Sequence, residues 1–184
     1  MREKRFIASP LLHVHLGVWK FIVGVWRALG CFMAEITEAL AMDDASAGVL
    51  LRHLLNGLYA LSALKKPPEL VLPAFLWKLL ALSGFEPLAE RCGVCGRADI
   101  QSPRLEVEEG QVVCKACAPG RTLPLCEASL AALRHILYDD PGALYRFRLA
   151  PEPLRRLTAA AERFAETHLE RGFQTLDYYH ALRS

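Results

Sequence analysis

The sequence predicts a mainly α-helical protein, a helical bundle with a small four-cysteine module inserted between its two halves. Two observations lead to this fold class. Apolar residues recur at three- and four-residue spacing along most of the chain, whereas β-forming runs occur almost only between two C-x2-C pairs. The hydrophobic fraction of 53% supports a sizeable core, so we expect the 184 residues to fold rather than remain disordered.

Three helical segments are expected before the cysteines. Residues 10–42 form one long helix or two short ones, and their apolar face comprises Val18, Phe21, Ile22, Val25, Trp26, Leu29, Phe32 and Met33. A second helix begins near Ser46, a plausible N-cap, and reaches about residue 63. Its expected core positions are Leu50, Leu51, Leu54, Leu58 and Leu61. The third helix, over 69–83, is apolar nearly all round and should be central, with Gly84 as its C-cap.

Further helices are expected after the cysteines. One lies near 127–138, a longer one runs from about 151 to 170, and a short helical tail follows over 175–182. The chain therefore divides into an N-terminal helical part (1–90), a cysteine module (91–119) and a C-terminal helical part (120–184) that completes the bundle.

The four cysteines of the module have the spacing of a metal site. Cys92 and Cys95 form one C-x2-C pair, eighteen residues follow, and Cys114 and Cys117 form the second. Each pair makes a tight turn that aims two thiolates at one centre, and Zn²⁺ prefers four such ligands in a tetrahedron. A closed site of four thiolates has no open position for water, which favours a structural role. Iron or a redox-active cysteine pair are the alternatives.

The residues between the two pairs predict a β-hairpin. Residues 105–107 and 111–113 are β-forming runs, and Glu108-Glu109-Gly110 between them reads as a turn. The hairpin would return the second cysteine pair to the first, so we expect a zinc knuckle and hairpin module with Zn²⁺ as cofactor. The sequence leaves two roles open for the module: it only stabilises the fold, or it also contacts a partner.

The remaining cysteines and the polar residues give no sign of catalysis. Cys31 lies in an apolar helix and is expected in the core, whereas Cys126 sits at a helix start, either as a packing residue or as a mildly acidified thiol. The sequence has no Gly-rich phosphate loop, no G-x-S-x-G, no H-E-x-x-H and no nucleophile with an evident base. We therefore do not expect an enzyme.

Basic residues form local groups although the net charge is only +2. This balance excludes recognition of an anion by bulk electrostatics, so a nucleic acid would have to be bound by local patches. Arginine suits phosphate and carboxylate recognition, but glutamates share the last long helix, and a solvated charged face is the alternative. The candidate nucleic-acid or partner-binding residues are Arg97, Arg104, Lys115, Arg121, Arg155, Arg156, Arg163 and Arg171.

The order of these features resembles the bacterial recombination mediator family RecO. The likeness covers about residues 15–178, and its specific part is a buried helix that ends in a Gly-aromatic-x-Pro turn directly before the cysteines. It is carried by residues 75–87, 92–96 and 112–117, with weaker support from 32–36, Arg156-Leu157 and 167–169.

The resemblance implies a role in recombinational DNA repair, without chemistry on the DNA. The partners it implies are single-stranded DNA, the acidic C-terminal tail of single-stranded-DNA-binding protein, and RecR, in the cytoplasm. Members of the family normally begin with an OB-fold domain, and we expect that domain to be absent here because the likeness starts near residue 15.

Two other functions remain possible from the sequence. One is a zinc-stabilised protein-interaction scaffold without DNA binding, favoured by the modest net charge and the absent barrel. The other is a zinc-ribbon regulatory factor, which would need a recognition helix with base-reading side chains, and none is evident. Salt-dependent binding to single-stranded DNA would distinguish the RecO-like repair function from the scaffold.

Overall fold

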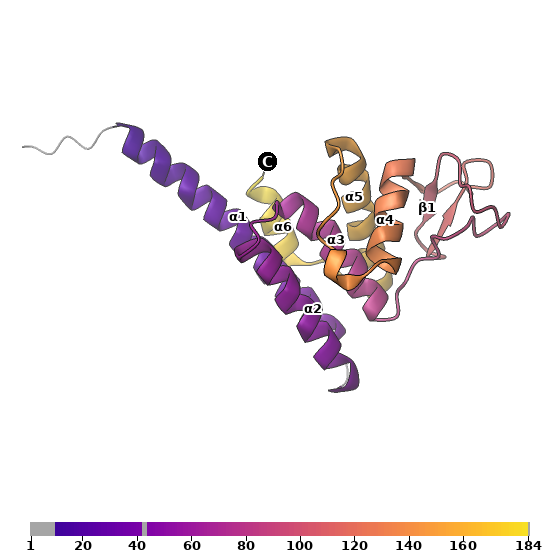
Figure 1. Cartoon of the computed structure of the whole chain (residues 1–184), viewed down its shortest axis with the longest axis horizontal. Helices are drawn as coiled ribbons and strands as arrows, with labels where there is room; N and C mark the ends of the chain where they lie inside the picture. Colours follow the sequence, from indigo (N-terminus) through magenta and orange to yellow (C-terminus); the bar gives the residue numbers. More distant parts are fainter. Residues whose placement is uncertain (1–9, 42–43, 184) are drawn as a thin grey trace, which may run out of the picture.

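The computed structural model of the chain describes the backbone of residues 10–41 and 44–183, and the side chains of residues 24–41 and 47–183. It confirms the predicted fold class, a helical bundle with one small antiparallel sheet (Figure 1). In chain order the elements are α1 (Pro10–Leu40), α2 (Asp44–Ser62), α3 (Pro68–Leu82), β1 (Arg104–Glu106), β2 (Gln111–Val113), β3 (Leu123–Pro124), α4 (Glu127–Tyr138), a 3-10 turn η1 (Pro141–Ala143), α5 (Pro151–Leu169) and α6 (Gln174–Ala181).

Helix α1 is one continuous helix, the first of the two predicted alternatives. Val25, Leu29, Phe32 and Met33 are buried, as their spacing predicted, and Trp26 is partly buried. The side chains of Val18, Phe21 and Ile22 lie outside the described residues. The prediction for Cys31 is wrong, because this residue is exposed. Helix α1 packs on α2, α3 and α6 from one side only, so an apolar sequence does not bury its whole circumference.

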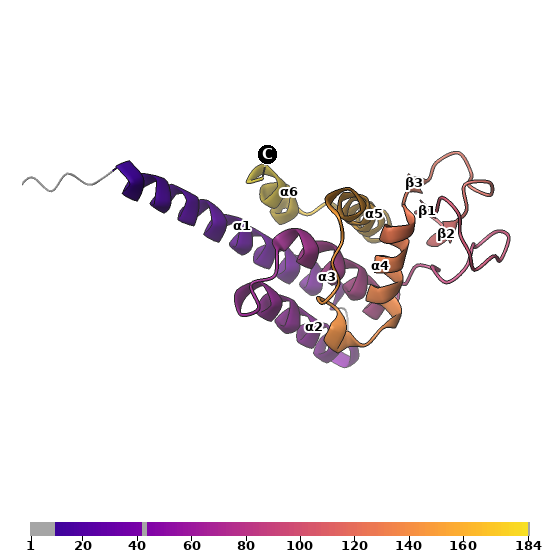
Figure 2. The same ribbon diagram turned by 45° about the horizontal axis from the view of Figure 1, so that its top comes forward.

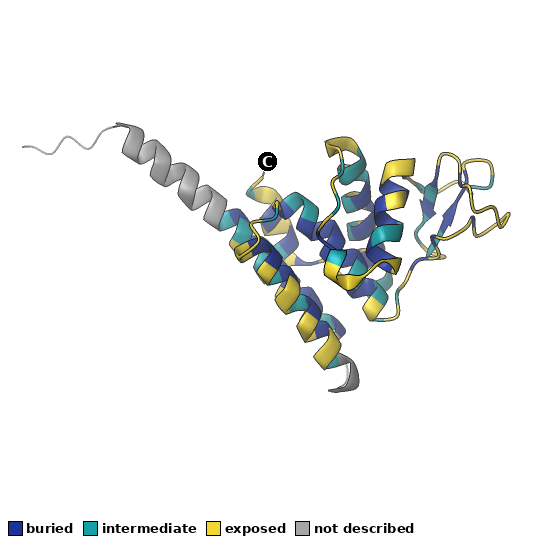
Figure 3. Ribbon diagram, in the orientation of Figure 1, coloured by how far each residue is buried: buried dark blue, intermediate teal, exposed yellow. Residues whose placement is uncertain are grey.

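Helix α3 forms the centre of the bundle, as predicted from its uniform apolarity. It contacts α1, α2, α4 and α5, and the buried residues concentrate around it (Figure 3). Two polar side chains on α3 bond to neighbouring helices: the Trp77 indole N–H donates to the Leu157 carbonyl at 3.2 Å, and Lys78 Nζ donates to the Leu137 carbonyl at 2.8 Å. The first bond satisfies a buried indole N–H, and the second satisfies a carbonyl in the last turn of α4.

Helix α2 differs from its prediction in two respects. It begins at Asp44, so Ser46 lies inside the first turn and is not the N-cap. Leu50 and Leu61 are buried, but Leu51 is 54% exposed, and His53 takes a core position instead. The His53 ring stacks on Phe75 with centroids 4.7 Å apart, and its Nε2–H donates to the Phe75 carbonyl at 2.9 Å. That bond offsets the cost of burying a polar imidazole in an otherwise apolar contact.

The end of α3 positions the cysteine module. Gly84 has φ +90°, and the N–H of Phe85 donates to the Leu80 carbonyl at 2.8 Å, which is the Schellman cap expected of a glycine here. The chain then enters the module, which lies at one end of the bundle (Figure 2). Strand β1 lies between β2 and β3, with Leu105 opposite Val112 and Leu123. The hairpin is confirmed, whereas β3 was not predicted and lies beyond residue 119.

The helices after the module agree with the prediction. Helix α4 spans the predicted residues 127–138, with half-buried Cys126 as its N-cap, and α5 and α6 end within a residue or so of their predicted limits. Among the described residues, no helix combines the length and apolarity that a membrane span requires.

Candidate metal centre

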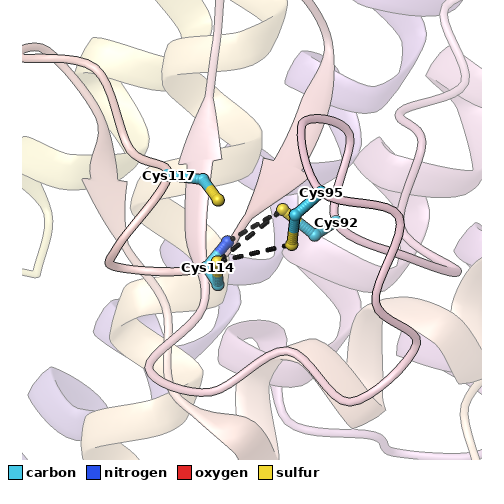
Figure 4. A group of neighbouring side chains, drawn as sticks. All are labelled: Cys92, Cys95, Cys114 and Cys117. Carbon is cyan, nitrogen blue, oxygen red and sulfur yellow. Dashed lines mark hydrogen bonds between the residues drawn. The ribbon is translucent and has the colours of Figure 1, made fainter.

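The four predicted ligands converge on one point. The sulfur atoms of Cys92, Cys95, Cys114 and Cys117 all lie within 4.8 Å of one another (Figure 4). The Cys114 sulfur lies 3.8 Å from that of Cys92 and 3.9 Å from that of Cys95. Four sulfurs placed ~2.3 Å from one tetrahedral ion would be roughly 3.8 Å apart, so the spacing suits a four-thiolate metal site.

A tight turn positions the first pair of ligands. The Cys92 N–H donates to the Arg97 carbonyl at 2.8 Å, and the Gly96 N–H donates to the Cys92 carbonyl at 2.9 Å. Gly96 has φ +73°, a conformation that favours glycine, and it lets the chain reverse directly after Cys95. The turn therefore leaves the two thiols on the same side of the backbone.

Strand β2 brings the second pair to the first. The Val112 N–H donates to the Leu88 carbonyl at 2.8 Å, and the Gly93 N–H donates to the Val112 carbonyl at 3.0 Å. The knuckle thus adds to the free edge of β2, and Cys114 follows that strand directly. The hairpin fixes the distance between the two pairs, as the sequence predicted.

The hydrogen bonds around the sulfurs shift the pKa values of two of the thiols in opposite directions. Burial alone would raise the pKa of Cys92, but N–H groups of Cys95, Cys114 and Val94 donate to its sulfur and lower that pKa to about 6. The pKa of Cys117 shifts in the opposite direction. Its thiol hydrogen-bonds to the sulfurs of Cys114 and Cys95, which stabilises the protonated form and raises the pKa to about 12. A cation held by all four sulfurs would replace their protons, because the thiolate is the form that ligates a metal.

Two side chains that the sequence analysis did not nominate hold the module on the bundle. Arg134 on α4 donates from Nε to the Ala89 carbonyl at 2.7 Å and from Nη2 to the carbonyls of Glu90 and Ala98. His168 on α5 donates from Nε2 to the Val107 carbonyl at 2.8 Å. Arg134 and His168 both donate to backbone carbonyls, which carry no sequence signal. Only the three-dimensional arrangement therefore identifies these contacts.

Four of the nominated cations line clefts at the module and have exposed side chains. Arg97 and Lys115 line a shallow cleft beside Cys114. Arg121 lines a second cleft of about 530 Å³ between the module and α5, together with Arg163, whose guanidinium lies 3.4 Å from the carboxylate of Glu166. The structure thus brings Arg121 and Arg163 together from segments far apart in the sequence.

The other nominated arginines have partners within the fold. Arg104 donates to the hydroxyl and the carbonyl of Thr122, which joins β1 to the segment before β3. On α5, Arg155 and Arg156 both pair with Glu152, the latter at 2.9 Å. Arg171 lies 3.5 Å from the carboxylate of Glu35 and over the ring of Phe173.

A third hollow lies on the bundle, away from the module. It has a volume of about 540 Å³ and an apolar lining that includes Leu72, Leu149 and Leu154. Arg155 and Arg183 stand at its edge, with Glu69, Glu162 and His180. This groove between α3, α5 and α6 was not identified from the sequence, because its walls come from three separate segments.

The fold and the site define a helical-bundle protein with a four-cysteine module whose geometry suits a metal ion. Comparison with known proteins identifies the family: the family model described as "Recombination protein O C terminal" matches residues 27–177. The chain belongs to the RecO family, as the resemblance implied.

Curated relatives agree with this assignment. The chain is 33% identical over 148 residues to "DNA repair protein RecO" of Frankia casuarinae, a match that covers 79% of this chain and 59% of the relative. It is 34% identical over 143 residues to the protein of the same name from Anaeromyxobacter sp. (strain K), over 76% of this chain and 56% of the relative. The chain thus spans less than two thirds of the length of these relatives.

Proposed function

We propose that this chain is a RecO-like recombination mediator in DNA repair, a cytoplasmic binding protein without catalytic activity. It would bind single-stranded DNA, the C-terminal tail of single-stranded-DNA-binding protein, and RecR. The observation that carries the proposal is the family match over residues 27–177, which includes most of the bundle and the whole cysteine module.

We further propose that the metal is Zn²⁺ and that its role is structural. A closed set of four thiolates suits zinc, and residues Cys92, Cys95, Cys114 and Cys117 would hold it without an open position. Zinc supplies no chemistry to a substrate in such a site. The chain's own contribution is to keep the knuckle and the hairpin in register, so that Arg121 stays beside Arg163.

The groove between α3, α5 and α6 supports binding of an acidic tail peptide. Its apolar lining can receive apolar side chains, and Arg155 is 79% exposed at its edge, where it can pair with a carboxylate. The cleft lined by Arg121 and Arg163 supports binding of a phosphate backbone, since two guanidinium groups from different elements line one hollow, opposed there by the carboxylates of Glu106 and Glu108. The two ligands would therefore occupy different surfaces.

A crossed pair of charge reversals on one helix tests both assignments. Arg155→Glu should weaken a labelled tail peptide of single-stranded-DNA-binding protein at least about tenfold and leave oligothymidine binding unchanged. Arg163→Glu should weaken oligothymidine binding and leave binding of the tail peptide unchanged. The affinity of the unaltered chain for oligothymidine should fall steeply with added salt. No binding of either ligand by the unaltered chain at low salt contradicts the proposal.

One observation favours the second candidate, a zinc-stabilised scaffold without DNA binding. Arg104, Arg155, Arg156 and Arg171 already have hydrogen-bond or ion-pair partners inside the fold. The scaffold function predicts that the chain co-elutes with RecR or with single-stranded-DNA-binding protein but does not retain oligothymidine at any salt concentration. Size-exclusion chromatography with each partner separates the two functions.

A further inference from the structure

Three large apolar side chains are exposed around the first knuckle. Leu88 is 65% exposed, Val94 is 59% exposed and Tyr138 is 41% exposed. All three line one cleft of about 660 Å³, although they come from the segment after α3, the Cys92–Cys95 turn and the end of α4. Single exposed apolar residues are ordinary on a protein surface, whereas a group that lines one hollow marks an interaction site.

Acidic residues border this cleft. Glu86 and Glu90 line it, and both are exposed. Burial raises the pKa of the Tyr138 hydroxyl, and the negative charges of these two glutamates raise it further, so both carboxylates act on the same ring. Arg91 also lines the cleft, and Arg134 lies close by with its guanidinium bonded to three backbone carbonyls.

The bound metal would add negative charge to the same surface. Cys92 and Cys95 line the cleft, and four thiolates around one divalent ion carry a net charge of about −2. Together with Glu86 and Glu90, the centre makes this face anionic despite Arg91. Such a face repels phosphate groups and attracts lysine and arginine.

The backbone holds the surface in place. The Leu88 N–H donates to the Gly110 carbonyl at 2.8 Å, and the Leu88 carbonyl accepts from Val112, so Leu88 is fixed at the edge of the sheet. The Ala89 N–H donates to the Tyr138 hydroxyl at 3.4 Å. A surface that is already ordered loses little conformational entropy when a partner binds.

We propose that these five residues, Glu86, Leu88, Glu90, Val94 and Tyr138, form a docking surface, the knuckle patch, for a partner protein. The partner would present an apolar segment flanked by lysine or arginine, because its apolar side chains would cover Leu88, Val94 and Tyr138 while its cations pair with the two glutamates. This site is separate from the arginine-lined cleft and from the groove on the bundle.

The test uses the full zinc-loaded chain and two labelled probe peptides, one built of leucine and lysine and the other of leucine and glutamate. The leucine–lysine peptide should bind, and the combined change Leu88→Ser with Val94→Ser should weaken it at least about tenfold. The control Leu51→Ser with Leu55→Ser removes two equally exposed leucines from α2 and should leave binding unchanged. Glu86→Lys with Glu90→Lys should transfer the preference to the leucine–glutamate peptide.

Several outcomes would overturn the knuckle patch. Equal loss in the α2 control would mean that the peptide adheres to any exposed leucine. Unchanged binding by the Leu88 and Val94 variant, or equal affinity for both peptides, would also refute it. Competition by oligothymidine would assign the face to nucleic acid instead. All altered side chains are exposed, and backbone amide spectra of each variant verify that the fold is retained.

Discussion

The guanidinium of Arg134 donates from Nε to the carbonyl of Ala89 at 2.7 Å, three residues before Cys92, the first of the four clustered cysteines. The same side chain donates to the carbonyls of Glu90 and Ala98, on either side of the first knuckle. One arginine on α4 therefore holds both ends of the loop that carries Cys92 and Cys95. Its function is to fix the cysteine module relative to the bundle.

Replacement of Arg134 by alanine should destabilise the chain. Three carbonyls lose a charged donor, and a charged hydrogen bond contributes about 1.5–3 kcal/mol, less for partners that water can reach, so we expect a loss of about 1–3 kcal/mol in urea unfolding. Arg91→Ala is the control, because Arg91 is an exposed arginine on the cysteine-bearing loop that Arg134 contacts. Equal unfolding midpoints for Arg134→Ala and the unaltered chain would show that the contact does not stabilise the fold.

Removal of the metal should destabilise the module, because metal-binding energy becomes folding energy in such sites. We expect a chelator, or Cys92→Ser, to lower the melting temperature and to abolish stoichiometric zinc measured by mass spectrometry. Cys31→Ser serves as the control, since this exposed cysteine lies on α1 and outside the quartet. A melting curve that chelation leaves unchanged would contradict a structural role for the metal.

Two glycines of α2 should respond in opposite ways to alanine. A Cβ at Gly57 would overlap Met33 and lie 2.9 Å from the Phe75 ring, whereas a Cβ at Gly48 would meet nothing within 4 Å. Met33 and Phe75 are both fully buried, so a shift of either side chain would disturb the packing of the core. Gly57→Ala should therefore cost about 1–3 kcal/mol by overpacking, and Gly48→Ala should gain up to about 1 kcal/mol from helix propensity.

Chemical denaturation measures both changes on the same scale. A loss of stability in Gly48→Ala, or a gain in Gly57→Ala, would mean that α2 packs differently from the arrangement in which Gly57 faces Met33.

The features that the sequence predicted correctly depend on local patterns. The limits of α4, the cap at Gly84 and the hairpin follow from residue spacing, and the cysteine quartet follows from two short motifs at a fixed separation. Each of these signals lies within a few residues of the structure that it specifies, so no tertiary information is needed to read it.

The features that were missed depend on contacts between distant segments. Leu51 is exposed although its spacing predicted a core position, because the position of Phe75 on α3 decides which face of α2 is buried. Arg134 bonds to backbone carbonyls, and strand β3 is a two-residue element that exists only because it pairs with β1. Helical periodicity identifies an apolar stripe but not the neighbour that covers it.

The stability of the bundle should depend on pH through His53. Burial lowers the pKa of this imidazole from 6.5 to about 4, with an opposing contribution from the Phe75 carbonyl and a smaller lowering effect of Lys78. The unfolded chain therefore binds a proton at His53 between about pH 6.5 and pH 4, whereas the folded chain does not. The associated stability is present above pH 6.5 and is lost as the pH falls through this window.

The expected loss between pH 7 and pH 4 is roughly 3 kcal/mol, because the pKa of His53 is 6.5 in the unfolded chain and about 4 in the folded chain. Urea unfolding at a series of pH values measures it, and His53→Gln supplies the comparison, because glutamine can still donate to the Phe75 carbonyl but does not titrate. Other groups titrate in both proteins, so the difference between the two pH profiles isolates His53. Parallel profiles would mean that His53 accepts a proton in the folded state as readily as in the unfolded chain, and that the buried position on α2 is open to water.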